Sequence, residues 1–171
     1  MKIRMSKIKI PFVLIAHVLF IIIVYILQSM VFTYIPIGGV YPVLLPIAVV
    51  GIATFEGSSR GGGYGLLAGM LCDVSFNQPV AVMTVVLTAV GIVIGVLSET
   101  IMARGFPTYF LSCAAVLVLT SFISMFSLIF FANVEFSALI RTGVLQAFYS
   151  VIFALPIYPV VRALGRKVAS E

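Results

Sequence analysis

Residues 60–74 read RGGGYGLLAGMLCDV and combine closely spaced glycines with one acidic side chain. Glycines at this density occur in loops that cradle phosphate groups, but such a loop follows a strand and continues into Gly-Lys-Ser/Thr, which is not the pattern here. In a helix, Gly61, Gly65, Gly69 and Asp73 would share one face, because they recur at every fourth residue. Glycine at that spacing lets a second helix approach closely in a membrane bundle. Helix packing is therefore the better interpretation.

The same spacing recurs at Gly91 and Gly95 in a later apolar segment. These two glycines and the face formed by Gly61, Gly65 and Gly69 are predicted to pack helices inside the bundle or to form the groove for a partner helix. The spacing alone leaves both alternatives open.

Asp73 closes the glycine face near the predicted outer boundary of the membrane. It is expected either to cap a turn at the interface or to form an ion pair, since charge within a bilayer is costly unless paired. Arg141 lies about one turn into the last apolar segment from the same side. An ion pair of Asp73 with Arg141, or of Glu135 with Arg141, is the hypothesis, and simple snorkelling of Arg141 is the alternative. Double charge reversal restores assembly if the pair exists.

The remaining polar side chains of the apolar segments predict structure rather than catalysis. His17 has no cysteine or carboxylate at metal-ligand spacing, which predicts a core histidine bonded to a neighbouring helix. Cys72 and Cys113 are expected at opposite depths, too far apart for a disulfide. No catalytic, cofactor-binding or metal site is predicted. Three residues of the last segment are expected to bond between helices: Gln146, Tyr149 and Ser150.

The composition of the chain indicates the class of protein and the kind of secondary structure that contain these residues. Of the 171 residues, 63% are hydrophobic and 9% are charged, and the mean hydropathy is +1.28. Soluble domains are about 45–50% apolar and about 25% charged. The chain is therefore predicted to be an all-α integral membrane protein that forms one polytopic domain over residues 1–171.

Six membrane spans are predicted from the apolar runs and the Gly, Pro and polar residues between them. The first run is longer than the apolar core of a signal peptide, so a retained helix is expected. The second and third spans are short, and re-entrant segments are the alternative. The spans are predicted near residues 11–30, 41–55, 61–76, 80–98, 108–131 and 137–160.

Prolines refine these boundaries. Pro11 is expected near a helix start, where the missing amide hydrogen costs nothing. Pro46 is expected to kink the second helix, and Pro156 and Pro159 are expected to bend or end the last one.

The net charge of +5 does not indicate nucleic acid binding, because basic and aromatic residues are not interleaved on a polar surface. The basic residues instead indicate how the chain is oriented in the membrane. Residues 1–10 and 161–171 are basic, and six spans return both ends to the cytoplasmic side. Arg60 and Arg104 then lie in cytoplasmic loops. Only Arg141 departs from the positive-inside rule.

Residues 65–73, GLLAGMLCD, then Pro79-Val80-Ala81 and Gly91 and Gly95, resemble the central signature of the MreD family. That family has a glycine-spaced helix ending in aspartate, then a proline, then a glycine in the next helix. The motif covers about thirty residues, and the remainder agrees in hydropathy. Val80-Ala81 stands where the family commonly has glycine.

This resemblance implies a non-catalytic subunit of the peptidoglycan elongation machinery in the bacterial cytoplasmic membrane, with both termini cytoplasmic. The implied partner is an MreC-like bitopic protein, and through it MreB, RodA and a class B penicillin-binding protein. The implied fold resembles the six-helix substrate-binding subunits of energy-coupling-factor vitamin transporters. Such a subunit is also the alternative function.

Overall fold

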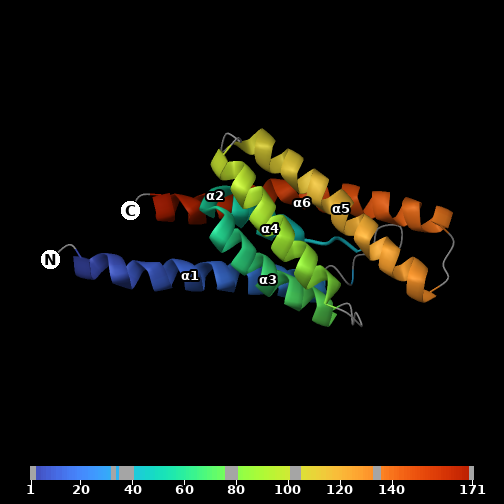
Figure 1. Cartoon of the computed structure of the whole chain (residues 1–171), viewed down its shortest axis with the longest axis horizontal. Coiled ribbons are helices and arrows are strands. Elements are labelled where there is room, and N and C mark those ends of the chain that lie inside the picture. Colours follow the sequence, from blue (N-terminus) through green and yellow to red (C-terminus); the bar gives the residue numbers. More distant parts are fainter. Residues whose placement is uncertain are drawn as a thin grey trace.

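The computed structural model describes residues 3–31, 34, 41–75, 81–100, 105–132 and 136–169, and Figure 1 shows the arrangement of their helices. Among these residues the chain is all-helical, as predicted, and strands do not occur. A π-helical segment, η1, follows the first helix directly. The elements are α1 Ile3–Ile26, η1 Leu27–Val31, α2 Leu45–Glu56, α3 Ser58–Ser75, α4 Val82–Thr100, α5 Phe106–Ala132 and α6 Phe136–Ala169.

The first and last helices are longer than predicted. α1 begins at Ile3 rather than near Pro11, and α6 continues through Pro156 and Pro159 to Ala169. Of the two alternatives for these prolines, bending or ending the last helix, the second is therefore wrong. Lysine, arginine and alanine are good helix formers, so the basic ends extend the helices. Both ends run past the other helices, and the two termini lie at the same end of the molecule (Figure 1).

α2 is the central helix of the bundle. Every residue from Leu45 to Thr54 is buried, and α2 contacts each of the other five α-helices. Its 12 residues span only about 18 Å, less than the hydrocarbon core of about 30 Å. Pro46 stands in the first turn, so the predicted kink is wrong: proline there removes no helical hydrogen bond.

Side chains from other helices satisfy the backbone just before α2. The Gln28 side-chain oxygen in η1 accepts from the Leu44 and Leu45 amides at 2.8 and 3.2 Å. From α6, Ser150 Oγ accepts from the Val43 amide and the Gln146 amide group donates to the Tyr41 carbonyl. Buried backbone groups need such partners because lipid supplies none. Gln146 and Ser150 were predicted to bond between helices. Their hydrogen bonds instead go to the backbone of the segment that precedes α2.

Within the part of the chain that the structure describes, three helical segments are long and apolar enough to cross a membrane: Val82–Thr100, Phe106–Ile123 and Thr142–Gly165. Leu14–Met30 and Leu45–Glu56 are apolar but shorter. These segments indicate a membrane protein.

Candidate functional site

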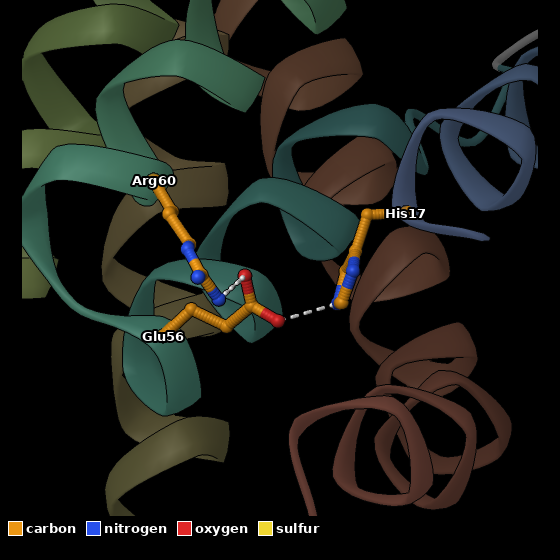
Figure 2. Close-up of polar contacts among 3 residues, drawn as sticks. All are labelled: His17, Glu56 and Arg60. Carbon is orange, nitrogen blue, oxygen red and sulfur yellow. Dashed lines mark hydrogen bonds and ion pairs between the residues drawn. The ribbon is translucent and has the colours of Figure 1, made fainter. Parts of the chain in front are cut away.

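Three polar side chains meet where α1 passes the turn between α2 and α3 (Figure 2). His17 Nε2 lies 2.9 Å from Glu56 Oε1, and an Arg60 guanidinium nitrogen lies 3.5 Å from Glu56 Oε2. The Glu56 carboxylate therefore stands between an imidazole from α1 and a guanidinium from the first turn of α3. We call these three residues the polar cluster.

The centre of the polar cluster is closed to solvent. The side chains of His17 and Glu56 are fully buried, whereas that of Arg60 is 36% exposed. The remaining exposure of Glu56 is in its backbone. The His17–Glu56 contact lacks the alignment of a hydrogen bond, so it acts through charge when the imidazole is protonated. A buried carboxylate needs such partners, since removing one from a buried pair costs about 3–5 kcal/mol.

A glycine makes the turn that brings Glu56 and Arg60 together. Gly57 separates α2 from α3 and has φ of 87°, a conformation that glycine adopts without strain. A Cβ at this position would also collide with Glu99 Oε1. The turn is thus one residue long, and Arg60 lies inside α3 rather than in the predicted cytoplasmic loop.

Tyr64 extends the polar cluster along α3. Its ring lies one turn beyond Arg60, and its centroid is 5.4 Å from that of the His17 ring. His17 is therefore enclosed by α2 and α3 together. The prediction that it is a core histidine is confirmed by its burial, and the neighbouring helix that its imidazole contacts is α2, through Glu56.

The geometry of the polar cluster favours a tether. A general acid or nucleophile must reach its substrate, and the facing atoms of His17 and Glu56 are sealed from solvent. What the arrangement does is hold the His17 imidazole of α1 against the Glu56 carboxylate at the α2–α3 turn.

The predicted glycine face lies against α4. A Cβ at Gly61 would lie 2.6 Å from the Gly91 carbonyl oxygen, and one at Gly65 would collide with the Leu87 carbonyl. At Gly69 it would collide with the Thr84 Cα atom. The face therefore serves packing within the bundle.

The two predicted glycines of α4 complete this contact. A Cβ at Gly91 would collide with the Gly61 carbonyl, and one at Gly95 with the Ser58 backbone. Backbones thus touch along the whole length of α3 and α4, which we call the α3–α4 hairpin.

Asp73 caps α4. Its two carboxylate oxygens accept from the Met83 amide at 3.0 Å, the Thr84 amide at 2.8 Å and the Thr84 hydroxyl at 2.6 Å. At the other end of the hairpin, Glu99 accepts from the Ser58 amide at 2.9 Å. Each helix thus places a carboxylate near its own C-terminus on the N-terminus of its neighbour, where negative charge is favourable.

The ion-pair hypothesis for Asp73 involves Arg141 and Glu135. The side chain of Arg141 and the whole of Glu135 lie outside the described residues, as do Pro79 and Val80 of the motif and the loop residue Arg104. What the structure adds is that both oxygens of Asp73 already accept hydrogen bonds from the start of α4.

Sequence reasoning missed Glu56, Gln28 and Glu99. Glu56 looked like part of a hydrophilic connection because Gly57, Ser58 and Arg60 follow it. A signal was present: a lone histidine in an apolar helix needs a polar partner.

Comparisons of the chain with protein-family models, with characterised proteins and with solved structures give no match. Its function is therefore argued from the site and from the residues of the motif.

Proposed function

We propose that this chain is a non-catalytic, multi-pass scaffold subunit of the cell-elongation machinery that makes peptidoglycan, and that it binds the transmembrane helix of an MreC-like partner. The observation that supports this proposal is where the described residues of the MreD-like motif lie. Gly65, Gly69 and Asp73, with Gly91 and Gly95, all belong to the α3–α4 hairpin, and each contacts the opposite helix. A motif whose residues fix two helices rigidly against each other suits a protein that presents a surface of fixed shape to other proteins.

The partner's helix binds an outward-facing surface, since the glycine face is filled by α4. Helix association in lipid depends on close packing, and a rigid bundle loses little freedom when it docks. In this proposal the protein lies in the bacterial cytoplasmic membrane with both termini inside, and it reaches MreB, RodA and a class B penicillin-binding protein through its partner.

Coexpression with an MreC-like protein tests the proposal. The tagged chain, purified in mild detergent, should recover the partner in a fixed ratio. Gly65→Leu, which forces α3 from α4, should lose the partner. Gly63→Leu is the matched control and should keep it, because a Cβ at Gly63 has no neighbour within 4 Å.

Two outcomes would contradict the proposal that the chain is a scaffold subunit. One is a folded wild-type chain that never recovers the partner. The other is a tightly held vitamin-sized ligand together with coupling to an ATPase module, which is the behaviour of the vitamin-transporter alternative.

A photo-crosslinking amino acid locates the binding face. Four exposed positions sample four helices: Leu19 of α1, Val85 of α4, Leu111 of α5 and Phe148 of α6. Crosslinks to the partner should come from neighbouring positions on one face, whereas the buried Ala68 should give none.

A further inference from the structure

An apolar groove lies between α1 and α6, near the end of the molecule where both termini lie. Its volume is about 570 Å³. The walls carry only aliphatic and aromatic side chains, and Pro159 inside α6 forms part of one wall. The lining residues are Ala16, Leu19, Phe20, Ile23, Pro159, Val160, Ala163 and Leu164.

A smaller hollow of about 270 Å³ adjoins this groove and adds a cation to it. It is lined by Tyr158, Pro159, Arg162 and Ala163, so it shares Pro159 and Ala163 with the groove. The Arg162 guanidinium lies 5.8 Å from the centre of the Tyr158 ring. Among the described residues no carboxylate pairs with Arg162, and the side chain is exposed.

The two helices that line the groove carry further basic residues in the sequence, Lys7 and Lys9 in α1 and Arg166 and Lys167 in α6. Basic pockets between membrane helices on the cytoplasmic side are typical binding sites for anionic lipid headgroups. The groove between α1 and α6 combines the same two features, apolar walls and the exposed cation of Arg162 beside them.

We propose that the groove between α1 and α6 is a specific site for one anionic phospholipid, with an acyl chain against the apolar walls and the headgroup phosphate at Arg162. The wholly aliphatic and aromatic walls suit an acyl chain. Charge favours an anionic over a neutral headgroup.

Native mass spectrometry of the full-length chain in detergent tests the site. The probes are phosphatidylglycerol and phosphatidylcholine with identical acyl chains. The wild type should hold one phosphatidylglycerol more tightly than phosphatidylcholine. Arg162→Gln should reduce this preference about fivefold, the factor expected for one basic residue near a lipid surface. Arg162→Lys should retain it.

Filling the groove tests the acyl-chain half of the site. Ala163→Leu should release both lipids, whereas Ala115→Leu on the exposed face of α5 should not. If Ala163→Leu fails to fold, Ala16→Leu fills the same groove from the facing helix.

Three results would overturn the proposal: equal retention of both lipids by the wild type, an unchanged preference in Arg162→Gln, or undiminished lipid binding in a folded groove-filling variant. Crosslinks from Leu19 to a partner helix seated in the groove would overturn it too. None of these results depends on whether the chain binds an MreC-like partner elsewhere, so the lipid site and the scaffold function succeed or fail separately.

Discussion

At the scale of single residues, the described carboxylates all hold helices together. Glu56 faces His17 and Arg60, Asp73 accepts from the start of α4, and Glu99 accepts from the start of α3. A carboxylate in an apolar bundle is costly unless several donors surround it. These acidic residues therefore link separate elements of the fold.

Glu56→Gln should lower the free energy of unfolding by about 1–3 kcal/mol. The amide keeps the shape of the side chain but removes the charge that faces Arg60 and His17. Unfolding in detergent with increasing sodium dodecyl sulfate, followed by circular dichroism, measures the loss.

The matched control is Glu99→Gln. Glu99 is exposed, and the amide keeps an oxygen that accepts from the Ser58 amide, so the change should stay within about 0.5 kcal/mol. Equal losses in the two variants would show that burial of the polar cluster contributes nothing special to stability.

Single residues were predicted unevenly from the sequence. The role of His17 followed from its isolation in an apolar helix, because a buried polar group must find a partner. The partner did not follow, since Glu56 and His17 are far apart in sequence and only packing brings them together. For Asp73 a cap of a turn at the interface was one of two interpretations, but the cap of α4 was not predicted, because its donors, the Met83 and Thr84 amides, depend on where α4 begins.

At the scale of elements, the two helices of the α3–α4 hairpin contact each other backbone to backbone. Its glycines bring carbonyl oxygens of one helix against the backbone of the other, and weak Cα–H···O contacts become favourable at such distances. The recurrence of glycine at every fourth residue predicted that Gly61, Gly65 and Gly69 share one helix face. It did not predict that the helix packed against this face is the next one along the chain.

Gly65→Ala should destabilise the protein and Gly63→Ala should not, although both positions lie in α3. An alanine methyl at position 65 would collide with the Leu87 carbonyl and should cost about 1–3 kcal/mol. At position 63 the methyl meets open space, so the higher helix propensity of alanine should leave stability unchanged or raise it by up to about 1 kcal/mol.

Unfolding midpoints of the two variants, measured side by side in one detergent, check this difference. Equal destabilisation would mean that glycine is needed throughout α3 for a reason other than contact with α4.

At the scale of the whole molecule, α1 and α6 frame the bundle and extend beyond it at the end where both termini lie (Figure 1). Basic residues occupy these extensions, with Lys7 and Lys9 in α1 and Arg166 and Lys167 in α6. The positive-inside rule then predicts that this end faces the cytoplasm.

Cysteine labelling checks this orientation. Single cysteines introduced by Ser6→Cys and Ser170→Cys should react with a membrane-impermeant maleimide only after the cells are permeabilised. The native Cys72 and Cys113 are buried and should react slowly in the wild type, which serves as the background control. Labelling of either introduced cysteine in intact cells would contradict the orientation.

The all-helical class followed from composition alone, whereas the arrangement did not. An apolar helix in a membrane bundle has no polar face to show which side packs against other helices. Hydropathy therefore locates the membrane spans but does not say which spans contact one another. α2 illustrates the difference: its run of Leu, Val, Ile and Ala reads as one more span, but the helix is only 12 residues long and lies enclosed by the others. The non-helical residues 41–44 that precede it are bonded to Gln28 and Ser150, which come from distant parts of the chain.

The exchange of caps within the α3–α4 hairpin bears on how the protein is made. During synthesis α3 emerges first, rich in glycine and not among the apolar segments fit to cross a membrane. The Glu99 carboxylate that closes its first turn is the second-to-last residue of α4, and the amides that Asp73 binds also belong to α4. Because each helix lacks one of its end contacts until both have been synthesised, we expect the pair to enter the bilayer together rather than one helix at a time.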